Sequence, residues 1–391
     1  MRAWSRSLTR QTVLALACGI VFVAPAAQAG ESVLYSIATS EAHSAIPVIK
    51  TQVFKTEIFA VDPETGKQRL VLSDANALFF LRGGIVAAGG KIFAEGIEPT
   101  HTAAGTPAFD PGAPAAIYEL STDGSGKARK VFDVERGEQG VNFTNLTFFN
   151  SSGSEFGNIN NIDGKFYLIV RDTATGKLLT KSEFKYGSVE RPGWRFGSVE
   201  RIGWLPDDKR IFFTIDLAGD SDDAWWTSPG SPVGTYVLDE NAATAERLAP
   251  EAALHPKIAG QQPSNDSPAV LIGALPDGGY LFQDYESGPS CTGACLYELD
   301  LTRKTQKTFP LHVDGDPGSF HLSRSGNRLA LTAALKKYEK QPEFTAKSTV
   351  EIWVLDLESG NKLKLFSFTI ADVTRNVDGP WMNLIGWLDD K

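Results

Sequence analysis

The chain contains 391 residues, of which 42% are hydrophobic and 22% are charged, so a wholly disordered chain is excluded. Its formal net charge is −9 at pH 7, which excludes a generic nucleic-acid-binding surface, because phosphate contacts need clustered Lys and Arg. Gly (37) and Pro (21) are plentiful, as in a β protein with many turns.

The first 29 residues have the pattern of a secretory signal peptide. Three arginines without an acidic residue precede an apolar run, and Ala27–Ala29 is a small-residue cleavage site before Gly30. A membrane anchor and lipidation at Cys18 are the alternatives, but the apolar run is short and no later segment could span a bilayer. We therefore expect residues 1–29 to be removed and residues 30–391 to form one domain, periplasmic or secreted.

One pattern recurs along the rest of the chain: an apolar and aromatic strand, an Asp or a near equivalent, a turn, and a strand with basic and apolar residues. Such alternation around a turn rich in Asp, Thr, Ser and Gly predicts an antiparallel hairpin. The copies recur every ~60 residues, which is typical of a repeat architecture. Their aligned anchor residues are Phe59, Tyr118, Ile169, Tyr236, Tyr297 and Trp353.

A second repeated element, a strand, a tight turn and another strand, precedes several of these hairpins. It begins as RIGWLPDDK at Arg201, LIGALPDGG at Leu271 and SFHLSRSGN at Ser319. A strand pair followed by a hairpin makes a four-stranded meander, and six such sheets around an axis form a β-propeller with short, protected edges. We predict an all-β, six-bladed propeller of four-stranded antiparallel blades. Seven or eight blades, or an ordinary β-sandwich, are the alternatives.

The two ends of this domain complement each other. LIGWLDDK, from Leu384, matches RIGWLPDDK, but no strand follows it. The segment SVLYSIAT, residues 32–39, could supply the missing strand. We therefore predict that the N- and C-terminal strands share one blade and close the ring. The third blade is less clear, because GKFYLIV, from Gly164, fits either a second or a third strand.

The turn W-L-P-D-D-K-R-I at Trp204–Ile211, followed by an aromatic-x-[LV]-D strand, resembles the TolB-type propeller repeat, in which the turn reads S-P-D-G-K. The similarity is one of pattern over most of residues 30–391, with Leu-Pro, Leu-Asp or Ser323–Gly326 at the turn. The resemblance implies a propeller in the bacterial periplasm or attached to a secreted hydrolase. It implies no catalytic set, and Tol-system function is not implied, because the N-terminal domain of the Tol protein has no clear counterpart.

An acidic loop is the candidate ligand- or partner-binding site. Asp220, Asp222 and Asp223 alternate with small residues and could offer oxygen ligands to Ca²⁺, although the EF-hand spacing and its closing Glu are absent. Trp225 and Trp226 follow, and exposed tryptophans could stack on sugar rings or dock into a partner. The alternatives are a solvated loop and tryptophans packed between blades. No other cofactor is evident.

A second candidate site contains histidine. No two histidines have the spacing of a metal motif, and no G-x-S-x-G nucleophile elbow is present. At the entry to one blade, however, an axial metal or acid–base cluster could form from His312, Asp314, Asp316 and His321. The alternative is a polar turn that leads into the inner strand.

Three residues separate Cys291 from Cys295 in a chain that we expect to be exported, so we predict a disulfide across a hairpin loop. For function, we predict an exported β-propeller that binds an envelope protein or a small molecule through loops on one face, because blades form a rigid ring while loops vary. The alternative is a propeller-type enzyme, such as a lactonase-like hydrolase or a quinoprotein-like dehydrogenase subunit, with an axial metal or polar site. Its catalytic residues are not assigned.

Overall fold

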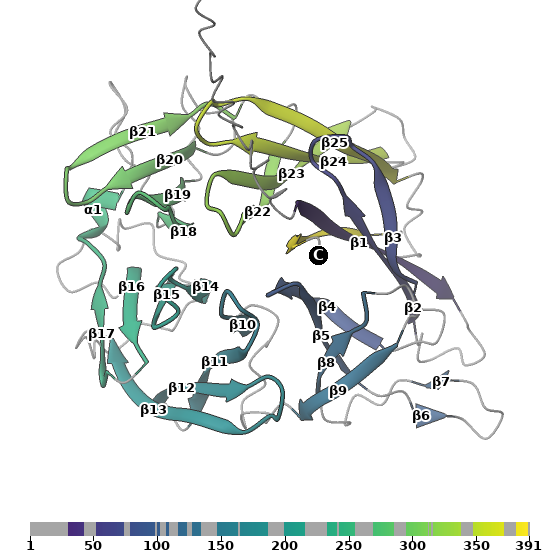
Figure 1. The fold of residues 1–391 in the computed structure, drawn as a ribbon, viewed down its shortest axis with the longest axis horizontal. Coiled ribbons are helices and arrows are strands. Elements are labelled where there is room, and N and C mark those ends of the chain that lie inside the picture. Colours follow the sequence, from purple (N-terminus) through teal and green to yellow (C-terminus); the bar gives the residue numbers. More distant parts are fainter. Residues whose placement is uncertain are drawn as a thin grey trace, which may run out of the picture.

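The computed structural model describes residues 30–42, 52–73, 79–97, 100–101, 107–108, 116–122, 127–133, 147–162, 165–186, 199–215, 233–240, 242–254, 269–284, 295–311, 313, 316–337, 347–370 and 381–389. These residues form a ring of β-sheets around a central axis, and the chain runs once around the ring (Figure 1). The helix α1 (Glu251–Leu254) is a single short turn between two of the sheets.

Each blade of the ring consists of four antiparallel strands, and two neighbouring blades join at their outer strands into one sheet of eight strands. The strands of each blade follow one another in space from the axis outward (Figure 1). Blade 1 contains β26 (Trp381–Asp389), β1 (Glu31–Ala42), β2 (Gln52–Val61) and β3 (Gln68–Ser73). Blade 2 contains β4 (Phe79–Ala88), β5 (Lys91–Ile97), β8 (Ala116–Leu120) and β9 (Ala128–Asp133). Blade 3 contains β10 (Thr147–Phe149), β11 (Glu155–Ile162), β12 (Lys165–Asp172) and β13 (Leu178–Tyr186).

The second half of the chain repeats this order. Blade 4 contains β14 (Val199–Trp204), β15 (Arg210–Ile215), β16 (Gly234–Asp239) and β17 (Thr244–Arg247). Blade 5 contains β18 (Val270–Ala274), β19 (Tyr280–Asp284), β20 (Cys295–Asp300) and β21 (Thr305–Phe309). Blade 6 contains β22 (Asp316–Leu322), β23 (Arg328–Lys337), β24 (Lys347–Asp356) and β25 (Lys362–Ile370). A short pair, β6 (Thr100–His101) and β7 (Pro107–Ala108), lies between β5 and β8 in the chain.

The predicted hairpins are the two outer strands of each blade, from β2–β3 through β24–β25. The segment GKFYLIV contributes β12, which is the third strand of blade 3, so the choice left open by the sequence is settled. Blades 3 and 4 touch at their outer edges, where Lys185 and Tyr186 pair in parallel with Thr244 and Ala245. The predicted all-β propeller of four-stranded antiparallel blades is therefore confirmed.

The predicted closure of the ring by both ends of the chain is also confirmed. β26 pairs along its length with β1, from Glu31 opposite Asp389 to Ala38 opposite Trp381. β1 in turn pairs with β2, so the last strand of the chain is the innermost strand of the first blade. In Figure 1 the C-terminus accordingly lies near the axis, beside the purple β1.

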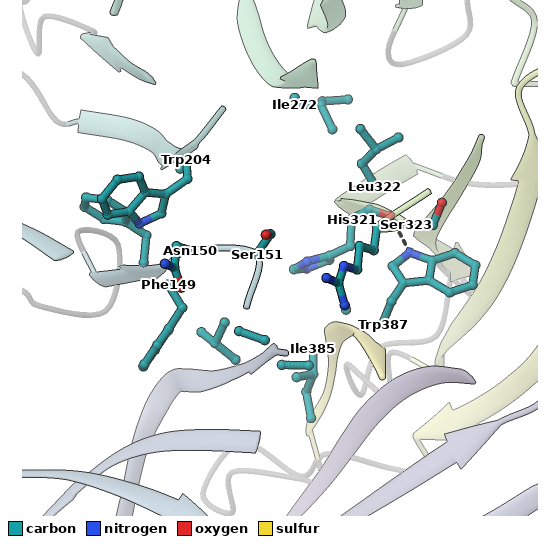
Figure 2. Close-up of a pocket in the computed structure, with 18 of the residues that line it drawn as sticks. Phe149, Asn150, Ser151, Trp204, Ile272, His321, Leu322, Ser323, Ile385 and Trp387 are labelled. Carbon is teal, nitrogen blue, oxygen red and sulfur yellow. Dashed lines mark hydrogen bonds between the residues drawn. The ribbon is translucent and has the colours of Figure 1, made fainter. Parts of the chain in front are cut away.

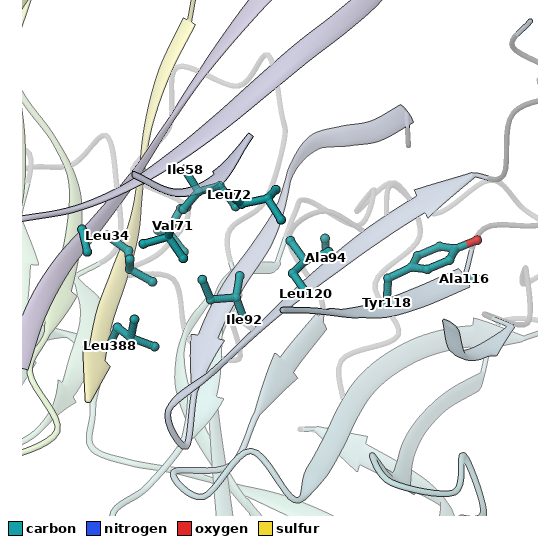
Figure 3. Close-up of a cluster of buried hydrophobic side chains, with 12 residues drawn as sticks. Leu34, Ile58, Val71, Leu72, Ile92, Ala94, Ala116, Tyr118, Leu120 and Leu388 are labelled. Atoms are coloured by element: carbon teal, nitrogen blue, oxygen red, sulfur yellow. The ribbon is translucent and has the colours of Figure 1, made fainter. Parts of the chain in front are cut away.

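The core is divided among the gaps between blades. In β1, Leu34 packs toward blade 2, whereas Val33 and Tyr35 pack toward blade 6. This alternation follows from the two-residue period of a strand, and it explains why these strands are apolar on both faces. Figure 3 shows the contact of blades 1 and 2, where Ile58 and Leu72 approach Ile92. Comparable buried clusters lie between every neighbouring pair of blades, including blades 6 and 1.

Because successive strands of a blade are antiparallel, the connections between them lie alternately at the two opposite faces of the ring. The turn face carries the turns from the third to the fourth strand of each blade and, in blades 2 to 6, the turns from the first to the second strand. In blade 1 the paired residues Glu31 and Asp389 lie where that turn would be. At the opposite loop face, second and third strands meet, as in the pairs Ile215–Gly234 and Asp284–Cys295. The strand ends on either side of residues 216–232 and of residues 285–294 therefore lie at the loop face, as do the ends that lead from one blade to the next.

Turns at the turn face contact their neighbours around the ring. The backbone N–H and hydroxyl of Ser151, in blade 3, donate to the carboxylate of Asp208, in blade 4, at 3.0 and 2.6 Å. Arg324, in blade 6, donates its backbone N–H to Glu31 and lies 2.9 Å from the carboxylate of Asp389, both in blade 1. These bonds connect separate blades, and at least one partner of each belongs to a turn.

Blades 2 and 3 approach even more closely at this face. A Cβ added to Gly89 would lie 1.7 Å from the carbonyl oxygen of Ser152, and one added to Gly153 would lie 2.6 Å from that of Ala88. Both glycines also have positive φ, at 57° and 67°. Only glycine allows two backbones to meet in this way.

Candidate functional site

A cavity of about 970 Å³ lies at the centre of the ring. Residues from the innermost strand of every blade line it: β4, β10, β14, β18, β22 and β26. Figure 2 shows Ile272, Leu322, His321 and Ile385 around the open centre, with Trp204 on the other side. The ring therefore places six strands that are far apart in the sequence around a single cavity.

Innermost strands have a sheet neighbour on one side only, so part of their backbone faces the cavity. Side chains bind several of these groups. The Arg201 guanidinium, from blade 4, donates to the carbonyl of Phe320 in blade 6. Nε1 of Trp387, from blade 1, donates to the carbonyl of His321 at 2.8 Å, and the His321 imidazole hydrogen-bonds to the backbone of Leu384. Together these bonds tie blade 6 to blades 1 and 4 at the cavity wall.

Arg201 and His321 give this wall its electrostatic character. Burial, together with the neighbouring Arg201 guanidinium, lowers the pKa of His321 from 6.5 to about 3, and the hydrogen bond to Leu384 opposes this shift only in part. At neutral pH the imidazole is therefore uncharged, and the guanidinium supplies the positive charge. A guanidinium beside the imidazole also opposes the binding of a metal cation there.

This pKa predicts how stability depends on pH. Below pH 6.5 the unfolded chain protonates His321, whereas the folded chain does so only near pH 3, so the free energy of unfolding falls as the pH drops through this window. The loss is up to about 1.4 kcal/mol per pH unit. Urea unfolding of the parent and of His321→Gln at pH 7 and pH 4.5 should show the parent losing about 2 kcal/mol more than the variant. Equal losses would contradict this origin.

The carboxylates at the turn-face end of the cavity have hydrogen-bond partners on neighbouring blades. Asp208 and Asp389 line the cavity, but they accept hydrogen bonds from Ser151 and Arg324. Trp204 packs against Phe148 at a centroid distance of 5.8 Å, and its Nε1 has no hydrogen-bond partner in the described part of the chain. Arg201 and His321 are among the polar residues that line the cavity, together with Asn150, Ser151, Ser319 and Asn383.

Most residues that the sequence predicts as site residues lie outside the described residues. This is so for the acidic loop with its tryptophans, for part of the histidine cluster, and for one cysteine: Asp220, Asp222, Asp223, Trp225, Trp226, His312, Asp314 and Cys291. The Ca²⁺ site, the cluster and the disulfide therefore stay predictions. Asp316 begins β22, and Cys295 is buried at the start of β20. Among the predicted site residues that the structure describes, His321 lines the cavity, whereas Asp316 and Cys295 do not.

Arg201 was missed as a site residue, although the repeat contains a signal for it. When the copies of the repeat are aligned at their tight turns, Arg201 takes the same position as Leu271, Ser319 and Leu384. Arg201 is therefore a charged residue at a position where the other three copies have an uncharged one. In the same alignment His321 takes the place of a glycine, whose counterparts are Gly203, Gly273 and Gly386. A residue that differs from its counterparts in the other repeats is one that the repeated fold does not itself require. Arg201 and His321 are two such residues, and both line this cavity.

Two general properties concern the described residues alone. No group of three or more His, Cys, Asp or Glu side chains is placed there to hold a metal ion. None of the helices in the same ranges has the length and apolar character needed to cross a membrane.

No family model matches the chain, and no curated protein matches it. Among solved structures, it is similar to TolB from Acinetobacter baumannii, at 15% identity and a TM-score of 0.43, over 90% of this chain and 66% of TolB. It is also similar to a 6-phosphogluconolactonase-like protein from Bacteroides fragilis, at 14% identity and a TM-score of 0.44, over 93% of this chain and 99% of that protein. A puromycin hydrolase has 14% identity and a TM-score of 0.40, over 83% of this chain and 43% of the hydrolase. Each likeness concerns the fold alone.

Proposed function

We propose that this chain is an exported binding protein that takes an envelope protein or a small molecule at its loop face. The observation that supports the proposal is the difference between the two faces. The turn face consists of short turns whose backbone and side chains bind one another, as between Ser151 and Asp208. The loop face carries the ends of the strands that lead into the longer connections, including residues 216–232 and 285–294.

A rigid ring with variable loops on one face suits recognition. The blades hold their relative positions through buried clusters in each gap, so loops can differ in sequence without loss of the fold. The predicted signal peptide supports an exported location, periplasmic or secreted. The segment with Asp220 and Trp225, which connects strand ends that lie at the loop face, combines carboxylates with the large aromatic rings that often anchor an interface.

A photo-crosslinking amino acid placed at Trp225 tests this proposal in cells that make the protein naturally. We expect a discrete adduct from that position. The matched position is Thr302, an exposed residue in the turn from β20 to β21 at the turn face, and it should give no adduct. Adducts of equal yield from both faces, or from the turn face alone, would contradict loop-face recognition.

The double variant Trp225→Ala, Trp226→Ala separates recognition from folding. If the two rings bind the partner, the adduct formed from a neighbouring loop-face position should be lost, while the melting temperature stays within about 2 °C of the parent. Differential scanning calorimetry provides the second measurement. A large fall in melting temperature would instead place these rings among the packed side chains of the blades.

A further inference from the structure

The wall of the axial cavity is polar, and the charges in it cancel. Among the described residues that line the cavity, two are cations and two are anions at pH 7: Arg201, Arg324, Asp208 and Asp389. Each of the four is engaged within the protein by hydrogen bonds or ion pairs between blades. A ligand with a net charge would lose its hydration without gaining a counterion from these residues, so the cavity favours a neutral ligand.

Two neutral hydrogen-bonding side chains lie on neighbouring inner strands. Ser319 in β22 and Asn383 in β26 are exposed, and both line the cavity. β22 and β26 are close to each other, since Nε1 of Trp387 donates to the carbonyl of His321 at 2.8 Å. A hydroxyl group donates and accepts one hydrogen bond or more, and an amide offers two donors and one acceptor oxygen. Blades 6 and 1 therefore present uncharged donors and acceptors to the same space.

The imidazole of His321 adds an acceptor to this part of the wall. Its hydrogen bond to the backbone of Leu384 raises the pKa of His321, which means that the imidazole is the donor in this bond. A neutral imidazole has one N–H, so its second nitrogen accepts. Figure 2 shows the ring of His321 directed toward the open centre. A hydroxyl group of a ligand can donate to this nitrogen without a change in charge.

Aromatic rings lie on the other side of the cavity. Figure 2 shows Trp204 and Phe149 across the open centre from His321, and both rings are partly exposed and line the cavity. The face of an aromatic ring packs against C–H groups. A sugar has C–H groups on the faces of its ring and hydroxyl groups around the edge, so its two kinds of surface match the two sides of this cavity. The volume of about 970 Å³ is typical of small-molecule pockets, which measure about 300–1,000 Å³.

We propose that the axial cavity binds a neutral sugar, whose hydroxyl groups are held by Ser319, His321 and Asn383 and whose ring packs against Trp204. The cavity is lined by the innermost strands, and the function proposed above concerns the loop face. This proposal therefore goes beyond that function and does not rest on it.

Calorimetric titration of the full chain at pH 7 tests the site with glucose, galactose, mannose, N-acetylglucosamine, maltose and trehalose. At least one of these sugars should bind with a dissociation constant below about 1 mM. The amino and the uronic acid derivatives of that sugar should bind at least about tenfold more weakly, because their charge gains no counterion in the wall. Cyclohexanol, which has a ring but a single hydroxyl group, should not bind measurably.

Two variants locate the site. Asn383→Leu nearly keeps the shape of the side chain but removes its hydrogen-bonding groups, so it should weaken binding of the sugar about tenfold. Ser319→Trp places a large ring in the cavity and should abolish binding. The matched controls are Asn361→Leu and Ser367→Trp, which change exposed residues at the outer edge of blade 6. Both controls should bind the sugar within about twofold of the parent.

Thermal unfolding shows whether each variant folds. If one of the two cavity variants does not fold, the other variant and the comparison of neutral with charged sugars decide the question. The proposal is wrong if none of the sugars binds, if the charged derivatives bind as tightly as the neutral sugar, or if cyclohexanol does so. Unchanged affinity in the folded cavity variants would also overturn it. None of these results bears on the cross-linking test of the loop face.

Discussion

Deletion of residues 30–40 should abolish the cooperative unfolding of the whole ring, not only of one blade. β1 lies between β26 and β2, so without it the last strand of the chain has no sheet partner. The deletion also removes Val33, Leu34 and Tyr35, which are at most 1% exposed and belong to the clusters on both sides of blade 1. Thermal unfolding followed by circular dichroism should show no sharp transition.

A protein that begins at Gly30 is the control, and it should unfold cooperatively. The point variant Tyr35→Ala tests the same strand with less disruption, because Tyr35 stacks between Phe59 in its own blade and Phe366 in blade 6. Its loss should lower the free energy of unfolding by about 3–5 kcal/mol. A truncated protein with an unchanged melting transition would show that the ring does not depend on the pairing of β26 with β1.

Replacement of Gly89 by Ala should destabilise the protein far more than the same change at Gly66. Both glycines have positive φ, at 57° and 67°, so each variant carries a similar backbone strain of about 1 kcal/mol. A Cβ at Gly66 meets no atom within 4 Å, whereas one at Gly89 would lie 1.7 Å from the Ser152 carbonyl oxygen of blade 3. Because that oxygen belongs to the backbone, no change of rotamer relieves the overlap, and the two turns must separate.

Urea unfolding of both variants measures the difference. We expect a loss of about 1 kcal/mol for Gly66→Ala and about 3 kcal/mol or more for Gly89→Ala, the excess arising from overpacking between the blades. Gly153→Ala, which approaches the carbonyl of Ala88, should resemble Gly89→Ala. Losses of equal size at Gly66 and Gly89 would mean that the turns of blades 2 and 3 can part at little cost.

The fold was predictable because the information for each hairpin is local. An Asp at the end of the third strand accepts N–H groups of the following turn, as Asp62, Asp172 and Asp356 do, and the strands on either side alternate with a period of two. The pairing of the last strand, β26, with β1 was predictable for a related reason. The repeat that begins at Leu384 is recognisable but incomplete, so its missing partner had to come from elsewhere in the chain.

The cavity site was only partly predictable, because it is assembled from distant strands. His321 was a candidate through its sequence neighbours His312 and Asp316, yet in the folded chain its charged neighbour is Arg201, from another blade. No local pattern gives the distance between two inner strands, since that distance depends on how many blades close the ring and how far they are inclined. Alignment of the repeats would have identified both positions as exceptions, but not their proximity.

The alternation of side chains in strands such as β1 has a consequence for how this chain tolerates changes in its length. Insertion of one residue within β1 would turn Leu34 toward blade 6 and Tyr35 toward blade 2, so two gaps would receive side chains of the wrong size at once. Insertions between strands at the loop face change no such partner. Insertions at the turn face also leave the register unchanged, but they would disturb contacts between neighbouring turns such as those of Ser151 with Asp208. The face that we propose for recognition is therefore the one at which the length of the chain can vary with the least cost to the blades.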